Sequence, residues 1–445
     1  MYGWGTVFKI TPTGTLTTLY SFCALSNCAD GEEPEGLVQG VNGNFYGTTL
    51  GGGITGCNDG LDSCGTVFEI TAAGKLTTLY SFCALNGCQD GDYPEGELLQ
   101  VSNGYFYGET LAGGAIGCGT IFKISPAGKL TTLLSFEFGC GPSGGLIQAA
   151  NGNFYGVTGG GGSGEGCDLD DGCGTVFEAT STGHLTTLYN FCSNFACTDG
   201  AEPVGPLVQG ANGNFYGVTF NGGAHDAGTA FEMTPKGRLM TGFAFGGNYG
   251  SVPEAGLLQA TNGLFYGTTA EGGLGGKGTI FSISTGLGQF VKTQPAFAKE
   301  GATIGIFGQG FTRSSVVQFG GVQATSIRAV QPTFLEAKVP AGALTGSVTV
   351  TTNGTTLTSN QQFRVTPQVL SFSPPSGPVG TQVTITGTGF TQAMGVGFGD
   401  HVPAQFTVNS DTQITATVPS GAKTGPVGVL TKGGTGISSK TFTVN

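Results

Sequence analysis

The sequence has 445 residues, a formal net charge of −12 and 85 glycines, and only 10% of its residues are charged. Its hydrophobic content of 38% excludes a disordered chain, and its glycines do not recur at every third residue as they do in collagen. No stretch approaches the ~20 consecutive apolar residues that span a membrane. The acidic balance also excludes a basic surface for nucleic acids, so we expect neither a membrane span nor a nucleic-acid partner.

A six-residue phrase that begins with Gly-Thr returns six times along the first two thirds of the chain. The copies are GTVFKI at Gly5, GTVFEI at Gly65, GTIFKI at Gly119, GTVFEA at Gly174, GTAFEM at Gly228 and GTIFSI at Gly278. A repeat of this length indicates one supersecondary unit used many times. A whole unit contains four strand candidates, such as ELLQV, YFYGE, TIFKI and KLTTLLSF between residues 97 and 136.

Short turns connect the strands of each unit. The first two strands are joined by Asn-Gly, which suits both central positions of a type I′ hairpin turn. Each unit is therefore predicted to be a four-stranded antiparallel meander. Strands such as TVFKI and LTTLYSF carry large apolar side chains on both faces, so both faces of each sheet need a neighbouring sheet to cover them.

Sheets that bury one another's faces in a closed circle form a β-propeller, in which no terminal sheet remains exposed. We predict an all-β fold with a propeller of five to six four-stranded blades over residues 1–288. The hairpin from Gly5 to Phe22 is expected to be an outer half-blade or a closing element. The recurring phenylalanines are assigned to the core between blades: Phe8, Phe68, Phe122, Phe177, Phe231 and Phe281.

Twelve cysteines are present, and ten of them form close pairs within turn-rich loops. These pairs are predicted disulfides: Cys23–Cys28, Cys57–Cys64, Cys83–Cys88, Cys167–Cys173 and Cys192–Cys197. Such pairs in an acidic chain indicate an oxidising compartment, and we expect an extracellular or cell-surface protein. Zinc bound by four thiolates is the alternative, which we disfavour because no pair has a histidine nearby or a second pair at fixed spacing.

The two remaining cysteines, Cys118 and Cys140, precede a third strand and follow a fourth strand. In a meander these two loops leave the sheet on the same side, so we predict that the two cysteines bond to each other. The N-terminus lacks the features of a secretory leader, and Met1 lies inside a repeat. We therefore expect the natural start of the protein to lie upstream.

Most acidic residues of the repeats fall in the same long loops. Phrases such as ADGEEPEG and QDGDYPEG suggest calcium ligands, because clustered carboxylates suit a hard cation. The candidate ligands are Asp30, Glu32, Asp90, Asp92 and Asp199. The alternative is that Asp-Gly forms the turns while the acids keep a glycine-rich face soluble. Apart from calcium, no cofactor is expected.

Catalytic chemistry has little support in the sequence. The three histidines, His184, His225 and His401, have no cysteine or serine beside them in a recognisable nucleophile setting. We therefore expect no enzyme. Because many acidic residues share one face, two of their carboxyl groups can lie by chance at the distance that glycoside hydrolysis requires. An extracellular glycan-active enzyme is therefore kept as an alternative.

The phrases GTVFKITPTGTLTTLYSF and GLVQGVNGNFYGTTLGGG resemble the GloVer tandem repeat of secreted bacterial proteins, over about residues 1–288. The resemblance implies export, a propeller form and often a separate surface anchor, and it implies no established activity. This chain departs from the pattern because it lacks a leader, a complete first repeat and a recognisable anchor.

A different pattern occurs twice from about Gln289, over residues 289–365 and 366–445. Both copies consist of short alternating strands with Gly and Pro turns, which suit an antiparallel sandwich. They resemble the IPT/TIG immunoglobulin-like domain. Residues that match its GxGF and VP-GA-TG segments are Gly308, Gly310, Phe311, Val339, Pro340, Ala343 and Gly346, then Gly387, Gly389, Phe390, Val418, Pro419, Ala422 and Gly425.

Together these features predict a non-catalytic extracellular recognition or adhesion protein, with the propeller as a binding head on an immunoglobulin-like stalk. The expected partner is an extracellular polysaccharide or a surface protein. Besides the glycan-active enzyme, a structural matrix or filament subunit is an alternative, because an incomplete N-terminal blade allows self-association through strand pairing between chains.

Overall fold

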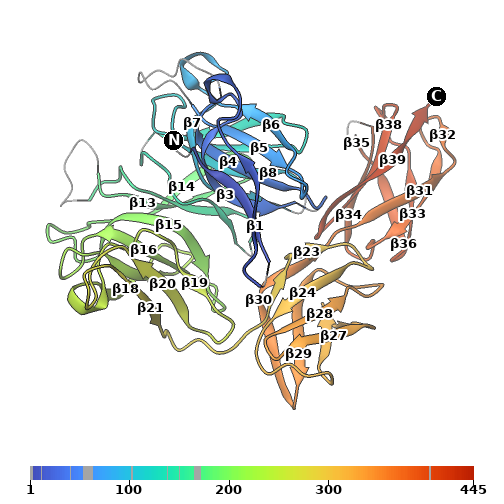
Figure 1. Ribbon diagram of the computed structural model, residues 1–445. Helices are drawn as coiled ribbons and strands as arrows, with labels where there is room; N and C mark the ends of the chain where they lie inside the picture. Colours follow the sequence, from blue (N-terminus) through green and yellow to red (C-terminus); the bar gives the residue numbers. More distant parts are fainter. Residues whose placement is uncertain are drawn as a thin grey trace. The chain divides into compact units, whose positions relative to one another are not determined.

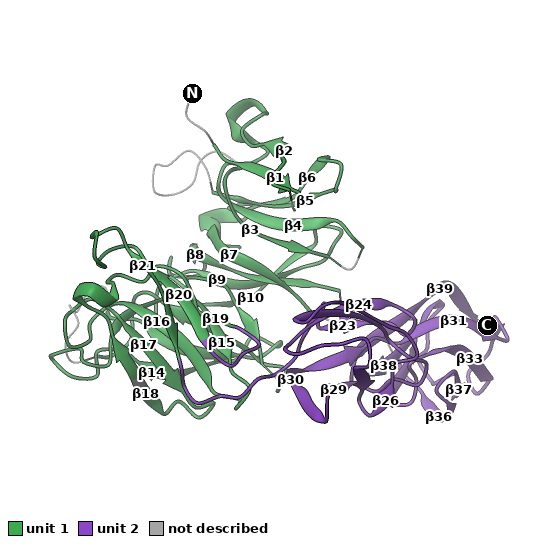
Figure 2. Cartoon of the chain, turned by 60° about the horizontal axis from the view of Figure 1, so that its bottom comes forward, with its two compact units in different colours: residues 1–259, 265–283 green, residues 260–264, 284–445 purple. Residues whose placement is uncertain are grey.

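The computed structural model describes residues 4–11, 13–40, 42–53, 64–101, 104–137, 139–149, 151–164, 172–399 and 402–445. The chain forms two compact units (Figure 2). Unit 1 comprises residues 1–259 and 265–283, and unit 2 comprises residues 260–264 and 284–445. In the described part of the chain, no helix has both the length and the apolar character needed to cross a membrane.

Unit 1 is a series of antiparallel meanders that follow one another along the chain (Figure 1). It opens with a hairpin of β1 (Thr6–Ile10) and β2 (Leu16–Ser21). Sheet 1 consists of β3 (Glu32–Gln39), β4 (Phe45–Gly51), β5 (Thr66–Ile70) and β6 (Leu76–Ser81), and sheet 2 of β7 (Asp92–Gln100), β8 (Phe106–Ala112), β9 (Thr120–Ile124) and β10 (Leu130–Ser135).

The later sheets repeat this order. Sheet 3 consists of β11 (Ile147–Gln148), β12 (Phe154–Thr158), β13 (Thr175–Ala179) and β14 (Leu185–Asn190), and sheet 4 of β15 (Ala201–Gln209), β16 (Phe215–Asn221), β17 (Thr229–Met233) and β18 (Leu239–Ala244). Sheet 5 has three strands, β19 (Leu258–Gln259), β20 (Phe265–Thr269) and β21 (Thr279–Ile283). Unit 1 is therefore the predicted series of propeller blades, with four complete sheets, one three-stranded sheet and a hairpin.

Each sheet packs through two different faces. The tyrosine face carries the tyrosine of the second strand, and the phenylalanine face carries the phenylalanine of the third strand. Between sheets 1 and 2, Tyr46 packs on Phe106 with ring centroids 4.2 Å apart, and Phe82 packs on Phe122 at 5.2 Å. Equivalent aromatic pairs recur between sheets 2 and 3 and between sheets 3 and 4. The tyrosine face of each sheet thus covers the phenylalanine face of the next.

The two ends of the series differ from this rule. The hairpin covers the phenylalanine face of sheet 1, where Val7 and Phe22 pack on Phe68 and Ile70. Its own Phe8, however, is 55% exposed, and Ile280 on the tyrosine face of sheet 5 is 83% exposed. The prediction that ring closure buries both terminal sheets, with Phe8 in the core, is therefore wrong for these faces, because none of the sheets described in unit 1 packs on them.

Unit 2 contains two sandwiches, each made of a four-stranded and a five-stranded sheet. The first has β22 (Lys292–Gln294), β24 (Thr303–Phe307), β28 (Phe334–Lys338) and β27 (Ile327–Gln331) facing β23 (Phe297–Ala298), β30 (Thr355–Val365), β29 (Gly346–Thr352), β25 (Val316–Phe319) and β26 (Val322–Gln323). Its core residues come from both sheets and form one cluster. This arrangement is immunoglobulin-like, as predicted.

The second sandwich repeats the first. It pairs β31 (Gln368–Ser373), β33 (Gln382–Thr388), β37 (Gln413–Thr417) and β36 (Gln405–Ser410) with β32 (Ser376–Gly377), β39 (Gly434–Val444), β38 (Gly425–Thr431), β34 (Ala393–Phe398) and β35 (Val402–Pro403). Gly310 and Gly389, from the two GxGF segments, have φ values of 70° and 73°. A turn with such φ values favours glycine, so these motif residues serve the fold.

Candidate functional site

The long loops of unit 1 meet on one side, which we call the long-loop face. The loop that enters a sheet bonds to the loop between the second and third strands of the same sheet. The N–H of Gly53 donates to the carbonyl of Cys28 at 2.9 Å, and the N–H of Gly114 donates to the carbonyl of Cys88 at 2.9 Å. The Gly223 N–H donates to the Cys197 carbonyl at 2.8 Å. The predicted common face of these loops is therefore present.

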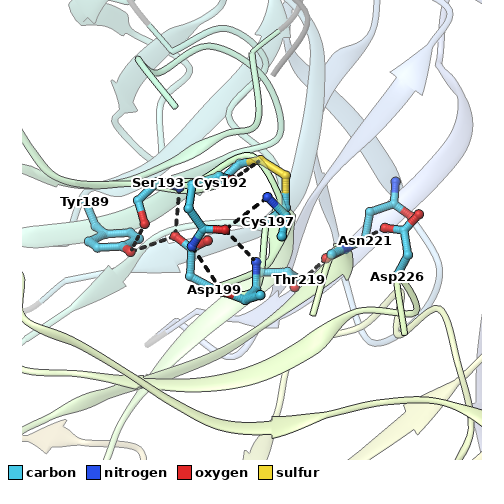
Figure 3. Close-up of a disulfide and its surroundings, with 12 residues drawn as sticks. Tyr189, Cys192, Ser193, Cys197, Asp199, Thr219, Asn221 and Asp226 are labelled. Atoms are coloured by element: carbon cyan, nitrogen blue, oxygen red, sulfur yellow. Dashed lines mark hydrogen bonds between the residues drawn. A yellow bond between two sulfur atoms is a disulfide. The ribbon is translucent and has the colours of Figure 1, made fainter. Parts of the chain in front are cut away.

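A Tyr-Asp pair fixes each of the three entry loops that contain a five-residue disulfide, as Figure 3 shows for Cys192–Cys197. Asp199 accepts a 2.7 Å hydrogen bond from the hydroxyl of Tyr189 and a 3.0 Å bond from the N–H of Ser193. The pairs Tyr20–Asp30 and Tyr80–Asp90 repeat this contact at 2.7 Å. Burial, with the hydrogen bond to Asp199 adding to it, raises the pKa of Tyr189 to about 12. These tyrosines therefore remain neutral donors.

The same contacts explain three of the five candidate calcium ligands. Besides Tyr20, the carboxylate of Asp30 accepts the N–H groups of Ala24 and Leu25 at 2.9 and 3.0 Å. Burial opposes the charged carboxylate, but these donors together lower the pKa of Asp30 below its usual value. Asp90 has the same three kinds of donor. The aspartates thus act as structural anchors of the loops.

The other two candidates, Glu32 and Asp92, begin strands β3 and β7, and Asp92 is buried. In the described part of the chain, three groups of potential metal ligands converge to within 4.8 Å, and Glu32 is the only carboxylate among them. The groups are Cys23, Cys28 and Glu32; Cys64, Cys83 and Cys88; and Cys173, Cys192 and Cys197. A calcium site at the loops stays a prediction.

Disulfides link the cysteines of these groups. The structure contains Cys23–Cys28, Cys83–Cys88 and Cys192–Cys197. Cys118, in the loop between β8 and β9 of sheet 2, bonds to Cys140 in the loop that enters sheet 3. Cys64 and Cys173 are disulfide-bonded as well. Their expected partners, Cys57 and Cys167, lie outside the described residues. The long-loop face is therefore held by covalent links in addition to hydrogen bonds.

At or before the start of the first strand, four sheets place a non-glycine residue in the left-handed region. The φ values are 54° at Glu33, 52° at Tyr93, 54° at Glu202 and 58° at Val252. Each N–H donates to the preceding meander, as from Tyr93 to the Cys64 carbonyl at 3.2 Å and from Glu202 to the Cys173 carbonyl at 2.8 Å. This conformation costs roughly 1–2 kcal/mol per residue, and such strain concentrates at functional sites.

The first strands lie against one another, which makes them the inner strands of unit 1. A Cβ atom added to Gly36 would lie 2.7 Å from the Glu97 Cβ, and one added to Gly205 would lie 2.8 Å from the Gly256 Cα. Only glycine permits this approach. The four strained residues therefore surround the long-loop end of the inner strands, a region that we call the mouth.

A group of carboxyls lies just inside the mouth. Glu95 on β7 is directly opposite Glu109 on β8 in the register. Glu109 is buried and accepts the Gly145 N–H at 2.9 Å through Oε1. Burial, opposed by this hydrogen bond and assisted by the charge of Glu95, raises the pKa of Glu109 to about 8. The pKa of Glu95 is raised as well, mainly by burial and to a smaller extent by the negative charge of Glu35.

The sequence interpretation missed both the strained residues and Glu109. Repeat alignment could have revealed Glu109, because the equivalent positions are uncharged: Thr48, Val157, Val218 and Thr268. No signal marked the strained positions, since none of them is glycine. Of the histidines, His184 is in the turn between β13 and β14, and His225 is in a long loop at the other end of its sheet. These two do not share a site, and His401 lies outside the described residues.

Family models match nearly the whole chain. The model described as the Gloeobacter/Verrucomicrobia repeat matches residues 1–194 and 168–309. The chain belongs to the Gloeobacter/Verrucomicrobia repeat family. The model of the IPT/TIG domain matches residues 291–365 and 367–444, so this member of the family carries two TIG domains after its repeats. No curated protein sequence matches the chain.

Solved structures resemble parts of this family member at low identity. A gluconolactonase from Xanthomonas campestris is 12% identical, with a TM-score of 0.35, over 70% of this chain and 87% of that protein. The surface glycan-binding protein PbSGBP-B from Prevotella bryantii is 20% identical, with a TM-score of 0.25, over 36% of this chain and 40% of that protein. Because these scores are low, the fold assignment rests on the sheet topology and the family matches.

Proposed function

We propose that this repeat-family protein is a non-catalytic extracellular recognition protein whose mouth binds a polysaccharide, with the TIG domains as a spacer. The observation that carries the proposal is the set of four left-handed residues at the mouth, Glu33, Tyr93, Glu202 and Val252. Four sheets bear the same backbone strain at the same position, and two of these side chains are carboxylates and one is a phenol.

The chemistry of the long-loop face suits sugars. Phe195 and Tyr249, in entry loops of neighbouring sheets on the long-loop face, are 83% and 71% exposed. Rigid aromatic rings offer apolar surface at a low cost in conformational entropy, and carboxylates accept hydrogen bonds from hydroxyl groups. The disulfides and Tyr-Asp pairs hold the loops in place before binding, which reduces the entropic cost further. The net charge of −12 favours a neutral polysaccharide over an acidic one.

The second candidate function is hydrolysis of a glycan by the facing carboxyls of Glu95 and Glu109. One carboxyl with a pKa near 8 beside a second carboxyl resembles the acid and base of a glycosidase. However, Glu109 is only 1% exposed, and its Oε1 already accepts the Gly145 N–H. A buried acid does not reach a glycosidic oxygen, so binding is the function we favour.

Affinity electrophoresis of the full chain in gels that contain xyloglucan, mixed-linkage β-glucan, starch or chitosan tests the proposal. We expect retardation by at least one of the three neutral polymers, and at least tenfold weaker binding after Tyr93→Ala or Phe195→Ala. Tyr105→Ala is the matched control, because Tyr105 is a partly exposed tyrosine next to a tight turn at the other end of its sheet. Lack of retardation by every polymer, or equal loss in the control, would contradict the proposal.

A reducing-end assay on the same polymers separates binding from hydrolysis. We expect no new reducing ends after prolonged incubation. Release of sugar products by the wild-type chain that disappears with Glu109→Gln would instead establish the enzymatic alternative.

A further inference from the structure

The two sandwiches of unit 2 belong to one compact unit, and residues 366–367 connect the last strand of the first to the first strand of the second. Hydrogen bonds join the sandwiches beside this connection. The Thr345 N–H donates to Oε1 of Gln392 in the second sandwich at 2.9 Å, and Nε2 of Gln392 donates back to the Thr345 carbonyl at 3.3 Å. A Cβ atom added to Gly433 of the second sandwich would clash with the Val365 carbonyl of the first. We call this region of contact the joint.

Two carboxyl groups meet across the joint. Glu300 lies in the loop between β23 and β24 of the first sandwich, and its side chain hydrogen-bonds to that of Asp411, between β36 and β37 of the second sandwich. Ionised carboxylates only accept hydrogen bonds, so a hydrogen bond between two carboxyl groups requires one proton. The contact between Glu300 and Asp411 therefore depends on the protonation of one of them.

The surroundings assign this proton to Glu300. Asp411 accepts the Thr391 hydroxyl at 2.6 Å and the N–H groups of Thr391 and Gly389 at 3.2 and 3.3 Å. Burial opposes its ionisation, but these donors together with Glu300 lower the pKa of Asp411 below its usual value. Burial, the hydrogen bond to Asp411 and the charge of Asp411 raise the pKa of Glu300 to about 7, although the Gly342 N–H, which donates to Glu300 Oε1 at 2.8 Å, opposes the shift.

The other charged residues near the joint do not cancel this arrangement. The pKa of Glu300 is raised in their presence, so burial and Asp411 together outweigh them. The remaining acids of unit 2 are Glu336, which bonds to Arg328 at 2.9 Å, and Asp400, which lies outside the described residues. The basic residues of the segments that form the joint are Lys299, Lys338, Arg364 and Lys432.

We propose that Glu300 and Asp411 form a proton-dependent lock that holds the two sandwiches together at the joint. With one proton between them the carboxyls bond, and with both ionised their charges repel, so that the sandwiches separate about residues 366–367. Because the pKa of Glu300 is raised from 4.5 to about 7, the contribution of the lock is complete below about pH 4.5 and is lost as the pH rises through 7. The spacer is therefore stiffer in acidic surroundings. The inference is independent of glycan binding, because these residues belong to unit 2.

Amide hydrogen exchange of the full chain at pH 5 and pH 8 tests the proposal. The reporter is the Thr345 amide, because its N–H bonds across the joint to Gln392. Wild type is compared at each pH with Glu300→Gln, so that the intrinsic pH dependence of exchange cancels. Glutamine has the shape of protonated glutamate and donates to Asp411 at every pH, so this variant stays locked. We expect equal protection of Thr345 at pH 5, and roughly tenfold weaker protection in wild type than in Glu300→Gln at pH 8.

Two controls separate opening of the joint from other effects. Glu336→Gln should behave like the wild type, because Glu336 is another partly buried carboxylate of the first sandwich but bonds to Arg328 within its own sheet. The amide of Val350, in the buried core of the same sandwich, should keep its protection in every variant and so verifies the fold. Equal protection of Thr345 in wild type and Glu300→Gln at pH 8, weaker protection in Glu300→Gln at pH 5, or parallel loss at Val350 would each overturn the proposal.

Discussion

The two units of this protein bury their apolar residues in different ways. In unit 2, each sandwich brings its two sheets together and completes a core of its own. In unit 1, each core is shared by two consecutive sheets, as when Tyr46 and Val67 of sheet 1 pack with Phe106 and Phe122 of sheet 2. A sandwich is therefore complete by itself, whereas a sheet of the repeat depends on both of its neighbours.

This difference explains where each unit leaves apolar surface exposed. Because a repeat sheet has two apolar faces, a series of sheets always ends with one uncovered face at each end unless it closes. Disulfides also distinguish the two units, because all twelve cysteines precede residue 198 and therefore belong to unit 1. Unit 1 thus combines buried junctions between sheets and disulfide-linked loops with partly exposed apolar faces on its first hairpin and last sheet.

The largest expected effect is at a junction between sheets. Phe122→Ala should destabilise unit 1 by roughly 3–5 kcal/mol, because Phe122 is completely buried between two sheets. The equivalent change at the uncovered end, Phe8→Ala, should cost less than about 0.5 kcal/mol. Differential scanning calorimetry can follow the two units as separate transitions, and the transition of unit 2 should not move. Similar losses at both positions would show that the ends are covered in solution.

Phe8 and Phe122 also show which features of the fold the sequence could predict and which it could not. Periodicity and Asn-Gly turns predicted the meanders, and the side on which loops leave a meander predicted the Cys118–Cys140 bond. Phe8 and Phe122 stand in nearly identical segments, GTVFKI and GTIFKI, so the sequence alone could not show that one side chain is exposed and the other buried. Burial depends on whether a neighbouring sheet is present, and that is a property of the whole series.

For the entry loops and the mouth, the sequence was informative to a smaller extent. The spacing of ten residues in Tyr20–Asp30, Tyr80–Asp90 and Tyr189–Asp199 was available, but the aspartates were interpreted as cation ligands because carboxylates cluster there. Their hydroxyl partners, which come from the preceding strand, were overlooked. Left-handed residues such as Glu33 could not be predicted, because contacts with the preceding meander impose the conformation.

The disulfides allow a second comparison, between a long and a short closure. Replacing Cys118 and Cys140 by serine opens a link with a separation of 22 residues, which should cost about 3 kcal/mol by loop entropy. The same change at Cys83 and Cys88, five residues apart, should cost about 2 kcal/mol. Both losses should appear only in the unit 1 transition. Zinc in the purified wild-type protein, measured together with free thiols, would contradict the disulfide assignment.

The buried Glu109 makes unit 1 sensitive to pH. Its pKa is raised from 4.5 to about 8, so the folded protein keeps a proton that the unfolded chain releases above about pH 4.5. Stability from this group is complete below pH 4.5 and is lost as the pH rises toward 8. Glu109→Gln should therefore stabilise unit 1 by on the order of 2 kcal/mol at pH 7 and have little effect at pH 4.

Melting temperatures of wild type and Glu109→Gln between pH 4 and pH 8 measure this effect. Glu271→Gln is the control, because Glu271 is an exposed carboxylate in the same unit and should give parallel curves. Parallel curves for Glu109→Gln as well would mean that Glu109 ionises freely in the folded protein.

The smallest expected effect concerns calcium. Asp30 and Asp90 each accept one hydroxyl and two backbone N–H groups from their own loops. A carboxylate that already has these donors gains little from a cation, so chelation with EGTA and later addition of millimolar calcium should leave the melting temperature of unit 1 unchanged. Tyr80→Phe, by contrast, removes one donor to Asp90 and should cost about 1 kcal/mol without calcium present. If calcium raised the melting temperature of the wild type by several degrees, the loops would be cation sites, and the aspartates would be ligands in addition to anchors.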